Sequence, residues 1–255
     1  MIKNEERFTG KADIYGKFRS SYTSELIDHI CSLDGFSKGS VIADIGSGTG
    51  ILSRLLLERG NVVYCVEPND DMRKLAENDL GCVSGFKNFI SVNASAENTG
   101  LEKESIDFIT VAQAFHWFDE EAFKLECNRI LRNNGKVILV WNTRDYESEI
   151  IKSDFDIRKK YCIDTKGLGV SGSSSDLTSF YADGVFEKLI FKNDLSLDCE
   201  TYIGMNLSRS YAPKKDKDPE KYQGMVKELH SLFDKYSVNG LIYFPQFTEC
   251  YIGNV

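Results

Sequence analysis

The stretch VIADIGSGTGILSRLL, Val41–Leu56, constrains the fold more than any other part of the chain. An apolar run leads into Asp44, and glycines then occupy alternating positions at Gly46, Gly48 and Gly50. Glycine loses more conformational freedom on folding than any other residue, so this density of glycine indicates that something approaches the main chain closely. The pattern predicts a strand that stops at a glycine turn and opens a helix. Unpaired N–H groups at such a turn favour a ligand at that edge of the sheet, although a tight turn without a ligand is the simpler alternative.

The rest of the first half continues the alternation of short apolar strands and helical patterns, which predicts βαβ units and a parallel sheet. The expected strands are Val41–Ile45, Val62–Glu67, Phe89–Val92, Ile106–Ala112 and Lys136–Trp141. The expected helices are Tyr22–Leu33, Ile51–Arg59, Asp70–Leu80 and Glu120–Leu131.

The alternation stops after Asn142. Residues 143–180 begin with a helical pattern and then reach the glycine- and serine-rich GLGVSGSSS. VFEKLIF at 185–191 is expected to be a strand, a helical segment surrounds the charged loop APKKDKDPEKYQ, and FTECYIGNV is the expected final strand. There is no internal repeat and no sharp linker. We therefore predict a single α/β domain over residues 1–255, with an insertion between its late elements.

Composition limits the partners and the compartment. The 255-residue chain has a formal net charge of −8, which argues against a nucleic-acid-binding surface. The beginning, MIKNEERFTG, does not read as a secretory signal, and no apolar run approaches the ~18 residues that span a bilayer. The seven cysteines are scattered without a CxxC pair, and the three histidines are far apart. We expect reduced thiols, no metal site, no membrane contact and a cytoplasmic protein.

The spacing of the glycines discriminates between ligands. A dinucleotide fingerprint, G-x-G-x-x-G/A, would need a small residue where Ile51 stands. A carboxylate at Asp44 would also repel a pyrophosphate at the helix N-terminus, whereas it suits a ligand with an amino-acid ammonium. The residues therefore favour S-adenosylmethionine over NAD.

Residues after the second and third strands fit the same ligand. Glu67 ends the second strand, where a carboxylate can accept hydrogen bonds from both ribose hydroxyls. Met72 could cover one face of an adenine, and Ser95, Ala96 and Glu97 the other side, mostly through the backbone. Alone, Glu67 would equally suit a solvated strand end, and Met72 a core position.

DIGSGTG, followed by CVEPNDDM, NASAENTGL and AQAFHWFD at these intervals, resembles the class I S-adenosylmethionine-dependent methyltransferases. More narrowly, the chain is similar to the type-11 group that includes trans-aconitate methyltransferases. The resemblance covers residues 8–142 well and the remainder in outline. It implies a Rossmann-like seven-stranded sheet of order 3-2-1-4-5-7-6 with helices on both faces, in which FTECYIG is the antiparallel last strand.

The resemblance also implies roles along the chain. Residues 1–40 would form an N-terminal helical lid, 41–142 the cofactor-binding core, and 143–255 the substrate-side elements and final strands. Tyr15 and Arg19 match a Y-x-x-x-R element that closes over the cofactor, although SSY follows Arg19 in place of RPxYP. Gln113 would lie near the methionine end. The full set of expected contacts to S-adenosyl-L-methionine is Tyr15, Arg19, Asp44, Gly46, Ser47, Gly48, Thr49, Gly50, Glu67, Pro68, Met72, Ser95, Ala96, Glu97 and Gln113.

Methyl transfer from a sulfonium is an in-line displacement, so the protein mainly has to align the acceptor and exclude water. A hydroxyl or amine acceptor usually needs a base, and His116 is the candidate, with ordering of the loop as its alternative role. Asp119 is expected to cap the following helix. The residues expected to contact the substrate are Trp117, Arg144, Arg209 and Tyr211.

The sequence thus predicts a methyltransferase that acts on a small-molecule acceptor, at a carboxylate or hydroxyl oxygen. Three alternatives stay open: a non-catalytic module that binds S-adenosylmethionine, an NAD-dependent oxidoreductase, and an RNA methyltransferase, which the acidic composition disfavours.

Overall fold

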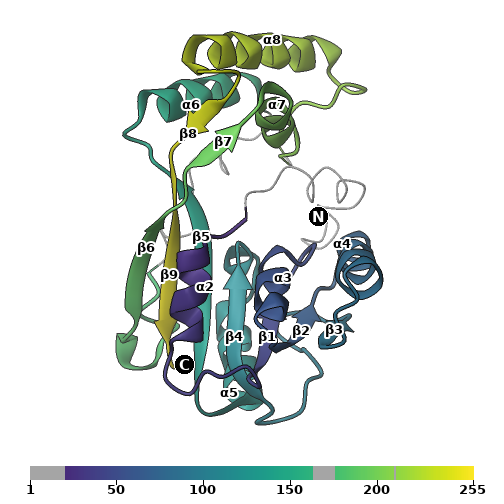
Figure 1. Ribbon diagram of the computed structural model, residues 1–255, viewed down its shortest axis with the longest axis vertical. Coiled ribbons are helices and arrows are strands. Elements are labelled where there is room, and N and C mark those ends of the chain that lie inside the picture. The colour runs from purple at the N-terminus through teal and green to yellow at the C-terminus, as the bar shows by residue number, and fades with distance from the viewer. Residues whose placement is uncertain (1–20, 163–175, 210) are drawn as a thin grey trace.

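The computed structural model describes residues 21–162, 176–209 and 211–255. The predicted contacts of Tyr15 and Arg19, and the GLGVSGSSS segment, lie outside these ranges. Figure 1 shows two parts: a sheet flanked by helices below, and a smaller, mainly helical part above the carboxyl ends of the parallel strands.

The lower part is built on a seven-stranded sheet of order β3-β2-β1-β4-β5-β9-β6. Strands β1 to β5 are parallel, and β9 runs antiparallel between β5 and β6. This confirms the predicted sheet, with β9 as its antiparallel last strand. The strands are β1 (Val41–Ile45), β2 (Val62–Val66), β3 (Phe89–Val92), β4 (Ile106–Ala112), β5 (Leu131–Arg144), β6 (Glu187–Lys192) and β9 (Gln246–Gly253).

The helices begin where short polar side chains can cap them. The side chains of Thr23, Asn69, Asp119, Asp198 and Asp218 each accept a hydrogen bond from a backbone N–H of the first turn, which confirms the predicted cap at Asp119. The α-helices are α2 (Ser24–Cys31), α3 (Ile51–Glu58), α4 (Asp70–Ala76), α5 (Glu120–Ile130), α6 (Glu149–Tyr161), α7 (Cys199–Leu207) and α8 (Pro219–Tyr236).

Several boundaries differ from the sequence prediction. The helix expected to end at Leu80 continues to Val83, because α4 passes into the π-helical turn η2 (Glu77–Val83). Helix α8 begins inside the expected charged loop, since Pro219 at the first helical position needs no N–H partner there. A second sheet, β7 (Leu195–Leu197) with β8 (Ile242–Phe244), was not foreseen.

Each face of the large sheet buries its own apolar cluster, as expected for strands covered on both sides. Odd-numbered residues of β5, such as Val137 and Trp141, pack on one face with helix α5. Even-numbered ones, such as Ile138 and Val140, pack on the other face with α2 and α3. Strand residues alternate because successive side chains point to opposite faces.

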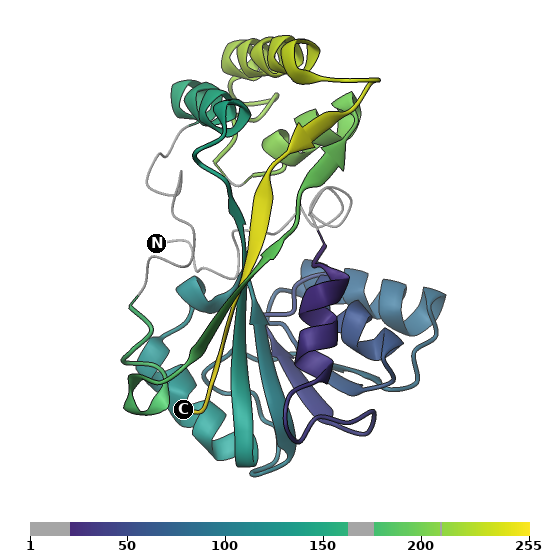
Figure 2. The same cartoon turned by 60° about the vertical axis from the view of Figure 1, so that its left-hand side comes forward.

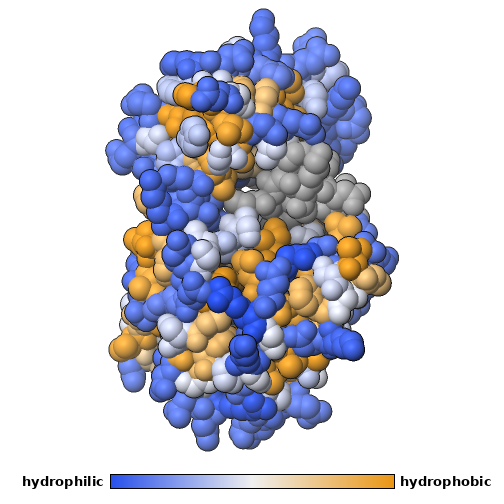
Figure 3. Space-filling view, viewed as in Figure 1, coloured by the Kyte–Doolittle hydropathy of each residue, from blue (hydrophilic) through white to orange (hydrophobic). Residues whose placement is uncertain are grey.

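The upper part has a third apolar cluster of its own, which includes Ile151 of α6, Tyr202 of α7 and Leu229 of α8. The buried residues of α8 line one side of it, and the surface over α8 is predominantly hydrophilic (Figure 3). Strand β5 is longer than predicted, and it pairs with β9 as far as Arg144 and Gln246. Figure 2 shows this ribbon passing from the sheet into the upper part.

All seven cysteines are free thiols. Within the described ranges, no helix has both the length and the apolar character needed to cross a bilayer.

Candidate functional site

The glycine turn between β1 and α3 places three residues in the left-handed backbone region. Gly46, Gly48 and Gly50 have φ of +66°, +58° and +81°. Such angles cost a residue with a Cβ on the order of 1–2 kcal/mol, so the turn favours glycine at each position. The turn is held to β2 because the N–H groups of Gly46 and Ser47 both donate to Val66 O, at 2.8 and 3.2 Å.

The space around each glycine is different. A Cβ at Gly46 would lie 2.6 Å from the Ala114 Cβ, and one at Gly50 would lie 2.6 Å from Leu80 Cδ1. At Gly48, by contrast, no described atom comes within 4 Å of that position. At Gly46 and Gly50, the missing side chain therefore lets a neighbouring side chain pack against the main chain. Of the three, Gly48 alone leaves open space where a ligand can lie against the main chain.

Two hydroxyl groups in the turn fit a polar ligand. Ser47 Oγ and Thr49 Oγ1 are buried and have no hydrogen-bond partner among the described residues. Buried polar groups are normally paired, and leaving one unpaired is costly. Together with the open space at Gly48, these atoms suit the predicted cofactor, whose methionine portion offers both donors and acceptors.

Asp44 lies beneath the turn rather than beside it. Its side chain is buried, and its carboxylate accepts hydrogen bonds from Ser53 Oγ and from Thr110 Oγ1 at 2.9 Å. Burial, together with the nearby charge of Glu67, raises the pKa of Asp44 to about 6, against the opposing effect of these two hydroxyls. Asp44 can therefore act on a ligand's ammonium as a buried charge more readily than by a direct contact.

Glu67 is placed at the turn itself. Its Oε2 accepts from the Gly48 N–H at 2.9 Å, and its Oε1 accepts from the Asn69 N–H at 2.8 Å. The carboxylate thus spans the ends of β1 and β2, the position from which it could exchange the Gly48 N–H for ribose hydroxyls.

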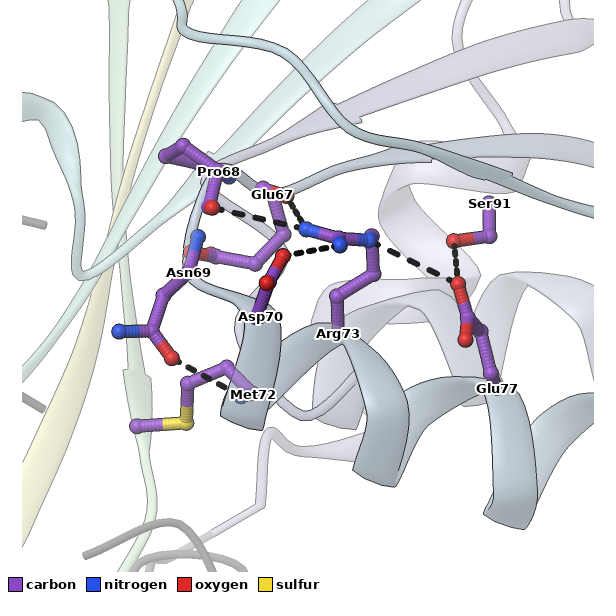
Figure 4. A network of polar contacts seen from close by, with 8 residues as sticks. All are labelled: Glu67, Pro68, Asn69, Asp70, Met72, Arg73, Glu77 and Ser91. Atoms are coloured by element: carbon purple, nitrogen blue, oxygen red, sulfur yellow. Dashed lines mark hydrogen bonds and ion pairs between the residues drawn. The ribbon is translucent and has the colours of Figure 1, made fainter. Parts of the chain in front are cut away.

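Arg73 is a residue of this site that the sequence analysis missed. Its Nη1 donates to the carbonyl oxygens of Glu67 and Pro68, at 3.1 and 3.5 Å, and it forms ion pairs with Asp70 and Glu77. Figure 4 shows these contacts linking the segment after β2 to helix α4. The acids three residues before and four after Arg73 were the available signal, because that spacing places them on one helix face.

The predicted adenine contacts gather beside this segment. Met72 is buried, and its N–H caps α4 by donating to Asn69 Oδ1 (Figure 4). Ala96 is also buried, while Glu97 Oε1 accepts from the Asp119 N–H at 3.0 Å. Glu97 therefore joins the loop after β3 to the start of α5. Ser95 and Pro68 lie half-buried in the same loops.

Gln113 follows β4 with a φ of +60°, unusual for a residue other than glycine. Its N–H donates to Val140 O at 2.9 Å, and its Nε2 donates to Asn142 O at 3.2 Å. Non-glycine residues in this region are held there by their surroundings and concentrate at functional sites.

His116 and Trp117 lie on the short 3-10 helix η3 (Phe115–Trp117), with ring centroids 4.6 Å apart. His116 is exposed and Trp117 half-buried, while Phe115 points into an aromatic cluster with Phe180 and others. The buried phenylalanine anchors the turn, so that its two neighbours are presented at the carboxyl edge of the sheet.

The predicted substrate residue Arg144 ends β5 and is largely buried in the upper part. It forms an ion pair with Asp154 of α6, and its guanidinium lies 4.7 Å from the centroid of the Phe244 ring. Arg158 Nε donates to the same carboxylate at 2.8 Å, and the Tyr202 hydroxyl donates to it at 2.9 Å. Asp154, Arg158 and Tyr202 were not predicted, since their proximity depends on how α6 and α7 pack.

Arg209 and Tyr211 complete this group. Arg209 Nη1 donates to the Tyr211 hydroxyl at 3.1 Å. Burial and the charge of Arg209 lower the pKa of Arg144 to about 10. Burial would raise the pKa of Tyr211, but the charges of Arg209, Arg158 and Arg144 outweigh it and lower that pKa. The structure thus brings Arg144, Arg209 and Tyr211 together near the carboxyl end of β5.

Known proteins match this sequence and this fold. Residues 43–139 match the Methyltransf_11 family model, described as a methyltransferase domain. An uncharacterized methyltransferase of Mycobacterium tuberculosis is 33% identical over 138 residues, which are 54% of this chain and 53% of the relative. A methyltransferase-like protein of Schizosaccharomyces pombe is 33% identical over 148 residues, 57% of this chain and 56% of the relative. The chain therefore spans about half the length of the curated relatives it matches.

Among solved structures, a candidate type II methyltransferase from Anaeromyxobacter dehalogenans matches with a TM-score of 0.67 at 18% identity, over 93% of this chain and 98% of that one. This similarity concerns the fold. Together with the sheet order, the matched sequence identifies a domain of the class I S-adenosylmethionine-dependent methyltransferase type in this chain. Within that class, residues 43–139 are a methyltransferase domain of the type-11 family. The narrower similarity to trans-aconitate methyltransferases stays a prediction.

Proposed function

We propose that the chain is an S-adenosylmethionine-dependent methyltransferase that modifies a small molecule at an oxygen atom. The observation that carries the proposal is the glycine turn of a matched methyltransferase domain. This turn combines open space at Gly48 with hydroxyls of Ser47 and Thr49 that have no hydrogen-bond partner in the part of the chain that the structure describes. Nothing in these residues favours the oxidoreductase alternative.

The cofactor-binding assignment follows the order of the loops along the carboxyl edge. The turn from Gly46 to Gly50 would hold the methionine portion over the buried charge of Asp44, and Glu67 would hold the ribose. Met72 and Ala96 would border the adenine. Gln113 would lie at the methionine end. When bound, S-adenosylmethionine supplies an activated methyl group on a positively charged sulfur.

The remaining task of the protein is to orient the acceptor and to exclude water. In this proposal the chain works as one unit, in which residues 41–142 bind the cofactor and residues 143–255 cover the acceptor. Trp117, Arg144, Arg209 and Tyr211 would contact the acceptor. A carboxylate oxygen would need no base, whereas a hydroxyl would transfer its proton to His116, which is exposed on η3.

Two measurements test the proposal in sequence. Isothermal titration calorimetry with S-adenosylhomocysteine should show one site per chain in wild type and a loss of affinity of about tenfold or more in Glu67→Gln, whose neutral amide is a weaker acceptor. Glu104→Gln, on an exposed turn at the far end of the sheet, is the matched control and should bind as wild type does.

Methyl transfer is then measured with a labelled methyl donor and a panel of small carboxylic acids, alcohols, phenols and amines. Label in an ester or ether product supports the proposal. Label only in amines would contradict oxygen as the target. Cofactor binding without any labelled product would favour the alternative of a non-catalytic binding module.

A further inference from the structure

The side chain of Gln113, at the expected methionine end of the cofactor, is oriented by β5 rather than by its own strand. Its main-chain N–H donates to Val140 O at 2.9 Å, and its Nε2 donates to Asn142 O at 3.2 Å. A carbonyl oxygen can only accept, so the end of the amide that faces Asn142 must be the NH2 group. Within the described ranges, no hydrogen bond involves Gln113 Oε1. The amide is therefore held by its nitrogen, and its oxygen is available as an acceptor.

The side chain of Asn142 is itself held from three directions. Its Oδ1 accepts from Thr248 Oγ1 at 2.6 Å and from Asn193 Nδ2 at 3.2 Å. Its Nδ2 donates to Ser21 O at 3.3 Å, and the same oxygen accepts from Asn193 Nδ2 at 3.0 Å. Thr248 lies directly opposite Asn142 in the β5–β9 pairing and is completely buried. Contacts from β9, from the β6–β7 connection and from the segment before α2 thus fix the part of β5 whose carbonyl holds Gln113.

The main chain of Gln113 depends on the same support. Its φ of +60° is a left-handed conformation that residues other than glycine rarely adopt. Such a conformation persists only where surrounding groups hold it. In the described part of the chain, the groups that bond to Gln113 are two carbonyl oxygens of β5. A shift of β5 near Asn142 would therefore release the amide and let its nitrogen, rather than its oxygen, turn toward the ligand.

We propose that Asn142 is a positioning residue, which orients the Gln113 amide so that Oε1 faces a positively charged group of the cofactor, its ammonium or its sulfonium. This inference rests on the proposed function, because it concerns the cofactor of the same site. A carbonyl dipole that is already held in place attracts a cation without having to reorient on binding. A released amide would present its N–H groups instead, and these repel a cation.

The test is a double-variant cycle in the full chain, with affinities for S-adenosylmethionine and S-adenosylhomocysteine measured by calorimetry. Gln113→Met keeps the length of the side chain without its polar atoms, and it should weaken S-adenosylmethionine binding by about tenfold. Asn142→Leu should weaken it by a similar factor with Gln113 intact. If Asn142 acts through Gln113, the double variant should bind no more weakly than Gln113→Met alone, because residues that act together are not additive. Additive losses would mean that Asn142 has only a structural role, and they would overturn the inference.

Thr248→Val removes the hydroxyl contact to Asn142 with little change in size. It enters the same cycle if Asn142→Leu does not fold, as judged by circular dichroism, and Thr248→Ser, which retains the hydroxyl, should bind as wild type does. Asn88→Leu is the matched control. Like Asn142, Asn88 is half-buried and donates through Nδ2 to a main-chain oxygen, but it precedes β3 at the opposite edge of the sheet. Its replacement should leave both affinities unchanged.

The two ligands identify the cation. A loss confined to S-adenosylmethionine indicates the sulfonium, which S-adenosylhomocysteine lacks, whereas equal losses for both ligands indicate the ammonium. If wild type binds both ligands and Gln113→Met leaves both affinities unchanged, the inference is wrong and the proposed function stands. If wild type binds neither ligand, the proposed function fails, and the inference fails with it.

Discussion

Gly48 differs from the two glycines beside it because its missing side chain faces open space rather than packed protein. The sequence indicated only that something approaches the main chain at these positions. The structure shows that the three glycines have different surroundings, since Ala114 and Leu80 are the close neighbours of Gly46 and Gly50. Which glycine serves a ligand could not be deduced from the motif, because those two neighbours come from distant parts of the chain.

Gly48→Ala should therefore affect binding more than folding. Gly60→Ala is the matched control, since Gly60 has a φ of +93° and likewise no described atom within 4 Å of its Cβ position. Both substitutions should lower the free energy of unfolding by about 1–2 kcal/mol. Only Gly48→Ala should weaken S-adenosylhomocysteine binding, by about tenfold or more. Urea denaturation and calorimetry measure the two effects separately.

Equal affinity of Gly48→Ala and wild type would show that the ligand lies elsewhere. Gly46→Ala provides the opposite case. Its Cβ would lie 2.6 Å from the Ala114 Cβ, so overpacking should remove about 1–3 kcal/mol of stability in addition to the backbone strain.

Asp44 should make cofactor binding depend on pH. Its pKa is raised from 3.8 to about 6 in the folded protein. A nearby ammonium favours the ionised carboxylate, so affinity for S-adenosylhomocysteine should increase as the pH rises through about 6 and then level off. The stability of the unliganded protein should change in the opposite direction. The free energy of unfolding should fall as the pH rises from about 4 to about 6, since the folded carboxyl holds its proton more tightly than the unfolded one.

Calorimetry between pH 5 and 8, in buffers of different ionisation enthalpy, would detect the proton released on binding below pH 6. Asp44→Asn should remove both pH dependences, whereas Glu67→Gln should weaken binding without removing them. A pH-independent affinity in wild type would contradict this electrostatic role for Asp44.

Helix α4 owes its position at the site to Arg73, which links it to the carbonyl oxygens of Glu67 and Pro68. Arg73→Ala should lower the free energy of unfolding by about 1–2 kcal/mol, because two backbone acceptors lose a charged donor. It should also weaken S-adenosylhomocysteine binding, since Glu67 is then less well positioned.

Arg59→Ala is the control for this prediction. Arg59 forms an exposed ion pair with Asp28, so its loss should change stability by less than about 1 kcal/mol and leave affinity unchanged. If Arg73→Ala and Arg59→Ala behave alike in thermal denaturation and calorimetry, Arg73 does not position the segment after β2.

The elements with strong periodicity were the ones that the sequence predicted well. Strands β1 and β4 match their expected bounds, since their apolar runs are buried on both faces and end at turn residues. The order of the strands came from the family resemblance. The length of β5 was underestimated because Asn142 and Arg144 are polar, and their pairing depends on β9, which is distant in sequence. Strands β7 and β8 have three residues each, too few for a periodic pattern.

The same reasoning limits the prediction of the charged group around Arg144, Arg209 and Tyr211. Arg144, Arg209 and Tyr211 could be chosen because they follow elements at the expected ligand edge. Asp154 and Arg158 sit on an ordinary charged helix in the sequence. Their burial depends on the packing of α6 against α8 and α7, which no local pattern encodes.

At the scale of the whole molecule, the β5–β9 ribbon joins the sheet to the upper part, and among the described residues Asn193, between β6 and β7, makes a set of polar contacts to this ribbon. Asn193 Nδ2 donates to Thr248 Oγ1 at 2.9 Å, to Asn142 Oδ1 at 3.2 Å and to Ser21 O at 3.0 Å. Its N–H also donates to Gln246 O at 2.9 Å. These contacts join β5, β9 and the segment before α2.

Asn193→Ala should loosen this junction without unfolding either part, because each part has its own apolar cluster. Hydrogen exchange measured by mass spectrometry should become faster in residues 142–144 and 246–248, while exchange in β1 and in α8 stays unchanged. Asn128→Ala, which removes one exposed contact within α5, should change exchange only locally. Because Arg144, a predicted acceptor contact, is paired with Gln246 at this junction, the loosened protein should still bind S-adenosylhomocysteine but transfer methyl groups more slowly. Faster exchange throughout both parts would instead mean that they unfold as one cooperative unit.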